Sequence, residues 1–441
     1  MRLSFITPVF ALFAAVASAD DRWPQFRGPD AAGVSQRTDL PSSWSESENV
    51  RWKIPAPGLS WSSPIVWDGK VYLTAAVPDK PQEPPKPGLY FGGDRMSPRD
   101  ATYVWEVLCI DLVTGKVDWR FKANKGKPKT PIHLKNTYAS ETPVTDGERI
   151  YAYFGAAGLY CVSASGSTVW QKDLGAYKTK MAWGTASSPI LVGDRLIVQV
   201  DNEENSFIVA FDKRTGAELW RKERKEATSW STPFVWKNDL RTEVVAVATK
   251  KVRSYDPASG DLLWELGPNS VIACPTPIAT RDLLYVSTGY VMDPYQKPLY
   301  AIKPGGKGDI SPEKDKTSGP FVAWSQRFGG AYMPSPVKVG DRLFVLYDLG
   351  MVACFDAATG KEIYGKQRLP GSGGFTASPW SYGGKVYCLS ESGTTFVIDG
   401  GTAFKIEGKN RLDGMFCATP AIADGKLLIR SATHLYCIES K

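Results

Sequence analysis

Histidine is almost absent from this chain, which has only His133 and His434 among 441 residues. The two lie far apart and have no partners at metal-ligand spacing, which argues against a histidine-based zinc site and against a Ser-His-Asp triad. No two cysteines are adjacent, and no phosphate-binding loop follows a strand. Carboxylates are abundant, so a glycosidase-like pair stays open, but no spacing points to one.

Long apolar runs are also missing after the first nineteen residues, so no transmembrane segment is expected. Within those nineteen residues, Arg2 precedes an apolar stretch that ends in Ala17-Ser18-Ala19, small residues typical of a signal-peptide cleavage site. We therefore expect an exported protein, periplasmic or extracellular, that is cleaved after Ala19. No cysteine follows this site, so a lipid anchor is not expected.

The composition is that of a large, turn-rich globular protein. Hydrophobic residues make up 43% of the chain, and 41 glycines and 32 prolines suit a β-rich fold with many turns. The formal net charge of +7 is spread along the sequence, which favours solubility. We expect no nucleic-acid partner and a monomer.

One short motif occurs eight times along the chain. It consists of Ser or Thr, then Pro, an apolar pair and, soon after, a tight-turn dipeptide. The copies begin at Ser63, Thr142, Ser188, Thr232, Thr276, Ser335, Ser378 and Thr419, and most successive prolines are 41 to 46 residues apart. A period of this length built from short strands indicates a β-propeller.

A second element recurs in five of the repeats, as in Asp212-Lys213-Arg214-Thr215-Gly216 before Trp220. The aspartate can cap the turn, the glycine permits positive φ, and the aromatic residue starts the outermost strand. Hairpin dipeptides such as Asp68-Gly69 lie near the start of most repeats. Together these signals predict four strands in each unit.

The chain ends predict how the ring closes. The last repeat stops at Ile438, one strand short, whereas residues 49–54 carry an outer-strand pattern without earlier strands of their own. Pairing the two leaves no long open edge. We predict an all-β fold, a single eight-bladed propeller of four-stranded blades over residues 49–441, closed by an N-terminal outer strand on the last blade. Residues 1–19 are then a signal peptide and residues 20–48 a lead-in.

The repeat from Ala210 to Trp220 resembles the tryptophan-docking motif of propellers with pyrroloquinoline-quinone (PQQ) repeats. That family includes quinoprotein dehydrogenases and the non-catalytic outer-membrane assembly lipoprotein BamB. The resemblance covers nearly all of the mature chain, and it is specific for fold rather than for function. This chain lacks the adjacent cysteine pair that the alcohol dehydrogenases of the family carry beside the quinone.

The seven cysteines are expected to be free. Cys109, Cys161, Cys354 and Cys437 occupy the same position in different repeats, and Cys274 and Cys417 share a second position. Equivalent positions in different blades are too far apart to bridge. These positions therefore indicate small buried side chains.

Candidate binding residues lie in the loops that lead into the innermost strands or join the second and third strands of each blade. Such loops meet on one face, here called the funnel face. The aromatic residues there could hold a protein or cell-envelope partner, for which we select Tyr90, Phe91, Trp61, Trp230 and Tyr332.

The resemblance also implies an enzyme alternative, a dehydrogenase that uses PQQ with Ca²⁺. In that case Trp183 would stack under the quinone, and Asp201, Asp293 or Asp348 would serve as calcium ligand or base. A third hypothesis is a carbohydrate-binding propeller with exposed aromatic platforms. Our leading hypothesis is a non-catalytic binding or scaffold module, similar to BamB, with a protein or cell-envelope partner.

Two insertions interrupt the period. Residues 77–103 include five prolines before Tyr90 and are expected to lie over the funnel face as a lid or contact loop. Residues 303–320 are rich in glycine and charge, and we expect a mobile surface loop on the opposite face.

Overall fold

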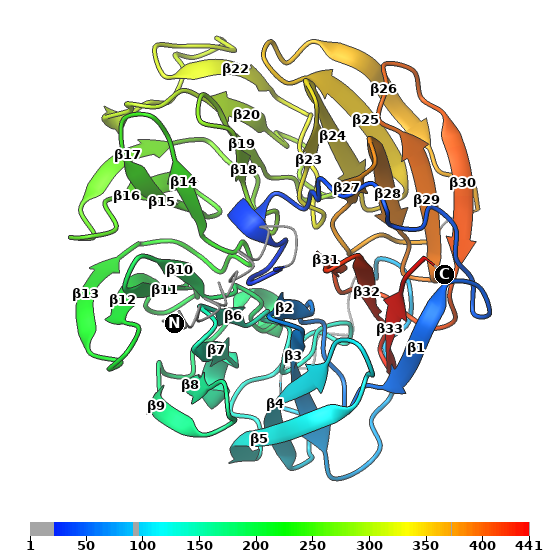
Figure 1. The fold of residues 1–441 in the computed structure, drawn as a ribbon. Coiled ribbons are helices and arrows are strands. Elements are labelled where there is room, and N and C mark those ends of the chain that lie inside the picture. Colours follow the sequence, from blue (N-terminus) through cyan, green and yellow to red (C-terminus); the bar gives the residue numbers. More distant parts are fainter. Residues whose placement is uncertain (1–21, 91–96, 372, 441) are drawn as a thin grey trace, which may run out of the picture.

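The strands form eight sheets that stand as blades around one axis in the computed structural model, which describes residues 22–90, 97–371 and 373–440 (Figure 1). The eight-bladed propeller and its four-stranded blades are thus confirmed. The predicted signal peptide, residues 1–19, lies outside the described residues, as does Phe91. None of the helices among the described residues is long and apolar enough to span a bilayer.

The first four blades run in chain order. Blade 1 has β2 (Ile65–Trp67), β3 (Lys70–Pro78), β4 (Tyr103–Asp111) and β5 (Val117–Gly126), and blade 2 has β6 (Val144–Thr145), β7 (Arg149–Tyr153), β8 (Leu159–Ser163) and β9 (Thr168–Lys172). Blade 3 has β10 (Ile190–Val192), β11 (Arg195–Val200), β12 (Phe207–Asp212) and β13 (Glu218–Glu223), and blade 4 has β14 (Phe234–Lys237), β15 (Thr242–Val247), β16 (Val252–Tyr255) and β17 (Leu262–Leu266).

The other four blades complete the ring. Blade 5 has β18 (Ile278–Ala279), β19 (Leu284–Ser287), β20 (Leu299–Ile302) and β22 (Val322–Gln326), and blade 6 has β23 (Val337–Val339), β24 (Arg342–Tyr347), β25 (Met351–Asp356) and β26 (Glu362–Arg368). Blade 7 has β27 (Trp380–Tyr382), β28 (Lys385–Leu389), β29 (Thr394–Asp399) and β30 (Ile406–Arg411), and blade 8 has β31 (Ala421–Ala423), β32 (Lys426–Arg430) and β33 (His434–Ile438).

The ring closes as the chain ends predict. Strand β1 (Val50–Pro55) pairs antiparallel with β33, with Trp52 opposite Cys437 and Ile54 opposite Leu435. In Figure 1 the blue β1 lies beside the red β33. The first and last parts of the chain therefore share one sheet, and blade 8 has no long open edge there.

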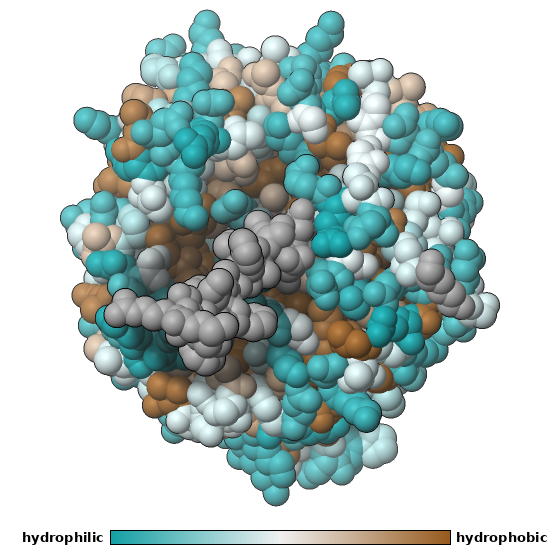
Figure 2. Space-filling view, in the orientation of Figure 1, coloured by the Kyte–Doolittle hydropathy of each residue, from teal (hydrophilic) through white to brown (hydrophobic). Residues whose placement is uncertain are grey.

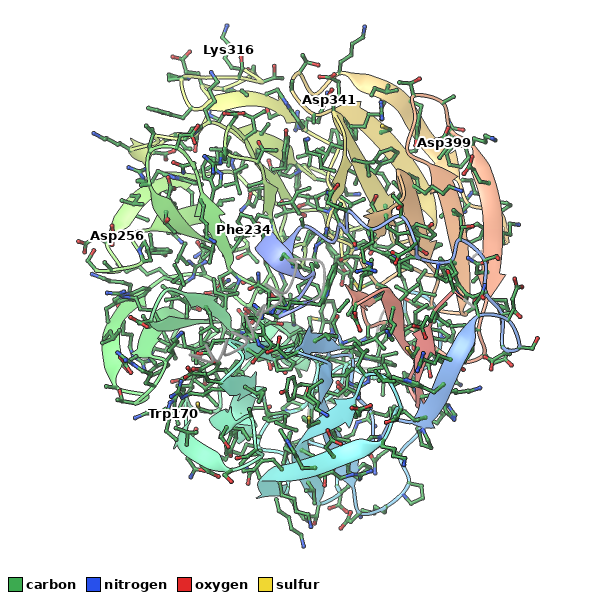
Figure 3. The ribbon with its side chains drawn as sticks, in the orientation of Figure 1. Trp170, Phe234, Asp256, Lys316, Asp341 and Asp399 are labelled. Atoms are coloured by element: carbon green, nitrogen blue, oxygen red, sulfur yellow. The ribbon has the colours of Figure 1, made fainter. Side chains whose placement is uncertain are left out.

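The hydrophobic core lies between neighbouring blades, because both faces of the middle strands are covered. Ile197 and Ile208 from blade 3, for example, pack with Val244 and Ala246 from blade 4. Phe234 on an innermost strand lies near the axis, whereas Asp256 and Lys316 lie at the rim (Figure 3). On the face shown in Figure 2, hydrophilic residues cover most of the rim and hydrophobic residues gather toward the axis.

The tryptophans that start or occupy outer strands dock onto the turn of the next blade. The Trp170 indole donates a hydrogen bond to the Lys213 carbonyl at 3.1 Å, and a Cβ on Gly216, where φ is 71°, would lie only 2.7 Å from that indole. Asp212 caps the same turn by accepting from the Thr215 amide at 2.8 Å. Trp52, Trp119, Trp220 and Trp324 make equivalent contacts. The Asp-to-Gly turn is thus a docking surface for the preceding blade.

The segment 303–320 adds a short strand to the neighbouring blade. Its residues Gly308–Asp309 form β21, which pairs in parallel with β17 and makes blade 4 five-stranded. Gly306 lies against the Trp264 ring, and Lys251 pairs with Asp309 at 2.7 Å. The expected surface loop thus carries a short strand. Blade 5 lacks the Asp-to-Gly turn, and Gly306 of this insertion covers Trp264 in its place.

All seven cysteines are free, as expected, and six are buried; Cys274 is partly exposed. Burial raises the pKa of Cys161 and of Cys354 to about 12, so these thiols stay protonated. They behave as small apolar side chains in the blade interior.

Candidate functional site: the axial chamber

A chamber of about 240 Å³ lies on the propeller axis. Its aromatic walls include four residues chosen above as candidates from the sequence, Trp61, Trp183, Trp230 and Tyr332. Tyr290 also lines the chamber. The rings contact one another in pairs, Trp183 with Trp230 at 5.9 Å and Tyr290 with Tyr332 at 5.3 Å between centroids. The Trp230 indole donates to the Gly184 carbonyl at 2.8 Å, which holds this ring in place.

Seven of the eight Ser or Thr residues that begin the repeated motif line the chamber in the described structure, and the hydroxyls of six of them join neighbouring blades. The Thr142 amide donates to the Ser188 hydroxyl at 2.9 Å, and the Ser188 amide donates to the Thr232 hydroxyl at 3.1 Å. The same bond from one repeat to the next occurs at Ser63, Thr276, Ser335 and Ser378. The amides of Ser63 and Thr276 donate in this series, but their own buried hydroxyls have no partner among the described residues, so the series is interrupted before each of them. The Ser/Thr-Pro motif therefore forms the inner wall of the chamber and also connects neighbouring blades.

The lead-in closes one end of the chamber. Trp23 pairs with Val66 of blade 1, Phe26 lines the chamber, and η2 (Pro29–Ala31) lies at the centre of the ring in Figure 1. The fully buried Arg27 donates to the carbonyls of Ala31 and Pro336 at 3.0 and 2.7 Å. The expected lead-in is thus a plug that contacts distant blades.

The first insertion contributes to the opposite wall. Gly88, Leu89 and Tyr90 line the chamber, and Tyr90 stacks on His133 at 5.8 Å. This placement agrees with the expected position of the insertion over the funnel face; residues 91–96 lie outside the described part.

One buried ion pair holds that insertion. Glu391, which is fully buried, accepts from the Gly88 amide at 2.6 Å and pairs with the Lys135 ammonium. Lys135 also donates to the Gly88 carbonyl at 3.0 Å, and the Thr376 hydroxyl donates to Glu391 at 2.6 Å. Lys135, which lines the chamber, is therefore charge-compensated. Neither His133 nor Lys135 was selected from the sequence, although they lie in the same class of loop as Trp183.

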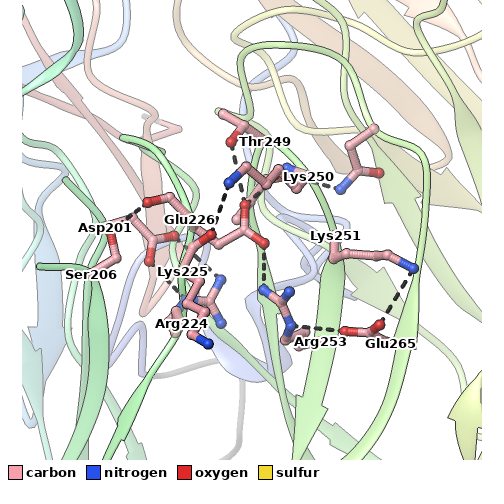
Figure 4. Close-up of polar contacts among 12 residues, drawn as sticks. Asp201, Ser206, Arg224, Lys225, Glu226, Thr249, Lys250, Lys251, Arg253 and Glu265 are labelled. Atoms are coloured by element: carbon pink, nitrogen blue, oxygen red, sulfur yellow. Dashed lines mark hydrogen bonds and ion pairs between the residues drawn. The ribbon is translucent and has the colours of Figure 1, made fainter. Parts of the chain in front are cut away.

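The three aspartates proposed as calcium ligand or base each belong to a separate local network of hydrogen bonds. Asp201 forms an ion pair with Arg224 at 2.7 Å, with both side chains fully buried (Figure 4). It also accepts from the Ser229 hydroxyl. Asp293 caps its own loop by accepting from the Tyr295 amide at 2.9 Å. Burial acts to raise the pKa of Asp293, but this amide and the Ser270 hydroxyl hold it below the ordinary value.

Asp348 supports the chamber wall from behind. Its carboxylate accepts from the amides of Met333 at 3.0 Å and Tyr332 at 3.3 Å, two residues that line the chamber. Burial raises the pKa of Asp348 to about 7.

The described chamber lining does not fit a calcium-bound quinone. Ca²⁺ requires several oxygen ligands, usually including carboxylates, and no Asp or Glu is among the described residues that line the chamber. No group of three or more His, Cys, Asp or Glu side chains placed to hold a metal ion occurs in residues 22–90, 97–371 and 373–440. The chamber offers stacking faces and neutral hydrogen-bond groups, with Trp183 among them.

The loops on the funnel face also expose large apolar side chains that the sequence patterns did not reveal. We call them the apolar arc: Met181, Val271, Met292, Tyr295, Phe328 and Leu349, with exposed fractions of 53, 45, 61, 73, 49 and 56%. Each lies in a connection between outer and inner strands or between second and third strands. By contrast, Trp61, Trp230, Tyr332 and Tyr90, expected to contact a partner, are partly buried in the chamber wall.

Known proteins of similar sequence and structure agree with this architecture. The family model described as outer membrane protein assembly factor BamB matches residues 104–290 and 315–406. No curated protein matches the sequence. The matched family segments include neither the lead-in nor the first insertion.

Three solved structures show the same fold at low identity. BamB from Moraxella catarrhalis is 13% identical with a TM-score of 0.52, over 76% of this chain and 94% of that one. A europium-containing methanol dehydrogenase is 10% identical with a TM-score of 0.62, over 94% and 90%. The quinohemoprotein alcohol dehydrogenase from Comamonas testosteroni is 11% identical with a TM-score of 0.60, over 97% and 82%.

The family match covers more than half of the chain, and the repeated turn, the docking tryptophans and the eight blades agree with it. This chain belongs to the BamB-like family of β-propellers with PQQ repeats.

Proposed function

We propose that this propeller is an exported, non-catalytic binding module that holds a protein partner of the cell envelope on its funnel face. The observation that carries the proposal is the apolar arc, because six large side chains exposed on one face of a soluble propeller indicate an interaction surface. The family model named for an outer membrane assembly factor supports a protein partner. The leader-like residues 1–19 support export.

Contacts between neighbouring loops hold the arc in position. The Lys180 ammonium donates to the Val271 carbonyl at 3.0 Å, and the Arg327 guanidinium donates to the Tyr295 carbonyl at 3.0 Å. Met181 has a left-handed φ of 53°, an uncommon conformation for a residue with a side chain. A preformed apolar surface loses little conformational entropy on binding, which favours its use as an interface.

Basic residues accompany the arc. Lys180, Arg327 and Arg368 each donate to a backbone carbonyl of an arc loop, whereas Asp293 and Asp348 in the same loops are buried. The partner segment that fits this face is therefore apolar with acidic residues at its edges.

A photo-crosslinking amino acid at Tyr295 is expected to give a discrete adduct with one envelope protein in the cells that express this chain. The same probe at Leu262 is the matched control, because Leu262 is 50% exposed but lies on the outer strand β17. The measurement is the adduct pattern on a gel. Equal labelling from both positions, or no adduct from Tyr295, would contradict the proposal.

A titration with PQQ and Ca²⁺ tests the enzyme alternative directly. We expect no calcium-dependent change in melting temperature and no alcohol-dependent dye reduction, because the described chamber wall offers no carboxylate ligand. Calcium-dependent stabilisation together with dye reduction would contradict the proposed binding module and would support a dehydrogenase.

A further inference from the structure

A second cavity, of about 160 Å³, lies between blades 1 and 2 and shares no lining residue with the axial chamber. We call it the blade 1–2 cleft. Its walls include the aromatic side chains of Trp105, Tyr138 and Phe154, and the Glu141 carboxyl lines it as well. This cleft plays no part in the function proposed above.

Glu141 is a buried acid without a basic partner in the described structure. It is 2% exposed and accepts a hydrogen bond from the Thr185 hydroxyl at 2.5 Å, but it takes part in no ion pair. Burial raises the pKa of Glu141 to about 7. The buried acids Asp201 and Glu391 differ, because Arg224 and Lys135 compensate them. A buried carboxyl of this kind is costly to ionise unless a cation meets it.

The aromatic walls of the cleft favour a cation. The Trp105 and Tyr138 rings lie edge to face, with centroids 6.4 Å apart and an interplanar angle of 70°. Both rings are held in place, since the Trp105 indole donates to the Tyr138 carbonyl at 2.9 Å and the Tyr138 hydroxyl donates to the Thr130 carbonyl at 3.1 Å. Fixed aromatic faces attract ammonium groups through their quadrupoles, and a carboxylate nearby adds to that attraction.

The rim of the cleft has the opposite charge. Lys125, Lys127 and Lys129 line it, and they belong to a stretch, residues 119–135, with six basic and no acidic residues. Lys127 pairs with Asp100 at 3.0 Å and Lys129 with Asp173 at 3.2 Å, both in exposed pairs that contribute little. The Lys125 ammonium takes part in no ion pair within the described parts of the chain. An anionic group at the rim would find a free cation.

We propose that the blade 1–2 cleft binds a small organic zwitterion, whose ammonium or alkylammonium group meets Glu141 and the aromatic walls and whose carboxylate or phosphate meets the lysine rim. A simple anion would gain only the rim, and a simple cation would have to pass it. The charge pattern of the cleft is thus complementary to a molecule that carries both charges.

Isothermal titration calorimetry with the mature chain tests this proposal, with glycine betaine, phosphocholine and L-leucine as the zwitterions. We expect at least one of the three to bind, and the arms distinguish carboxylate from phosphate and quaternary from primary ammonium. Tetramethylammonium chloride and sodium acetate each carry one half of the charge pattern, and we expect both to bind more weakly. Inorganic phosphate or acetate binding as tightly as the best zwitterion would overturn the proposal, as would no binding by any of the three.

Substitutions locate the site. Glu141→Gln keeps the size and removes the charge, and we expect it to weaken binding by about 30-fold or more. The Lys125 side chain is exposed, so we expect Lys125→Ala to leave the fold intact and to weaken binding. Lys178→Ala is the matched control, because the Lys178 side chain is 83% exposed elsewhere on the surface; this variant should bind the zwitterion as the unaltered chain does.

The pH dependence gives an independent readout. Because ammonium binding needs an ionised Glu141 whose pKa is about 7, affinity is expected to fall between pH 8 and pH 6. Equal affinity of Glu141→Gln and the unaltered chain would sink the proposal. Photo-crosslinking at Tyr295 tests the funnel-face partner separately. A negative result for the cleft therefore does not contradict the proposed partner, and a negative crosslinking result does not contradict the zwitterion site.

Discussion

Replacing Trp220 with alanine is expected to lower the free energy of unfolding by about 3–5 kcal/mol, the range for removing a buried aromatic side chain. Trp220 is 8% exposed, donates to the Pro257 carbonyl of blade 4 at 3.1 Å, and covers Gly260. The substitution would leave a cavity between blades 3 and 4 and lose the bond that joins them. Urea denaturation followed by fluorescence measures the change.

The neighbouring residue supplies the control for that experiment. Leu219→Ala alters the same outer strand, but Leu219 is 47% exposed, and we expect a change within about 0.5 kcal/mol. A similar loss of stability from both substitutions would show that the docking of Trp220 on the next blade is not what stabilises this strand.

Replacing Arg224 with methionine is expected to cost about 3–5 kcal/mol of folding free energy, because it leaves Asp201 buried without its cation. Arg224 bonds both oxygens of Asp201, at 2.7 and 3.3 Å, and donates to the Tyr255 hydroxyl at 2.9 Å. Burial alone would lower the pKa of Arg224, but the Asp201 carboxylate raises it above the ordinary value, so the guanidinium stays charged. The measurement is again the unfolding free energy in urea.

Two further variants separate the lost charge pair from a general effect of losing arginine. Arg281→Met removes a guanidinium that is 81% exposed in its pair with Asp239, and it should change stability by less than about 1 kcal/mol. Asp201→Asn in the Arg224→Met background should recover part of the loss, since it removes the unpaired buried charge. No recovery would mean that the arginine acts through packing alone.

Local hydrogen bonds and ion pairs also account for the positions of the three aspartates proposed as calcium ligand or base. Asp201, Asp293 and Asp348 were chosen because they lie in the right class of loop, and they do lie there. Each one, however, is used locally, as an ion-pair partner, a loop cap or a support for the chamber wall. A sequence identifies the loop of a carboxylate but not the donors that surround it.

Patterns that depend on local chemistry were predictable from the sequence. The Ser/Thr-Pro period, the turn from Asp212 to Gly216 and the outer-strand pattern of residues 49–54 predicted the blade count, the strand count and the closing pair β1–β33. Each of these depends on backbone dihedrals and on apolar runs within a few residues, which every repeat states again.

Contacts between distant residues decided the sites. The plug of Trp23 and Arg27 and the bond from Gly88 to Glu391 join parts of the chain that no local pattern relates. The same holds for the unpaired Glu141 within the described structure and for the basic rim near it, since charge compensation depends on which side chains meet after folding. The sequence by itself determined the propeller, because the signals for strands and turns are local and repeated. The chamber, the apolar arc and the cleft were decided only by the tertiary structure, because each forms where side chains from separate blades meet.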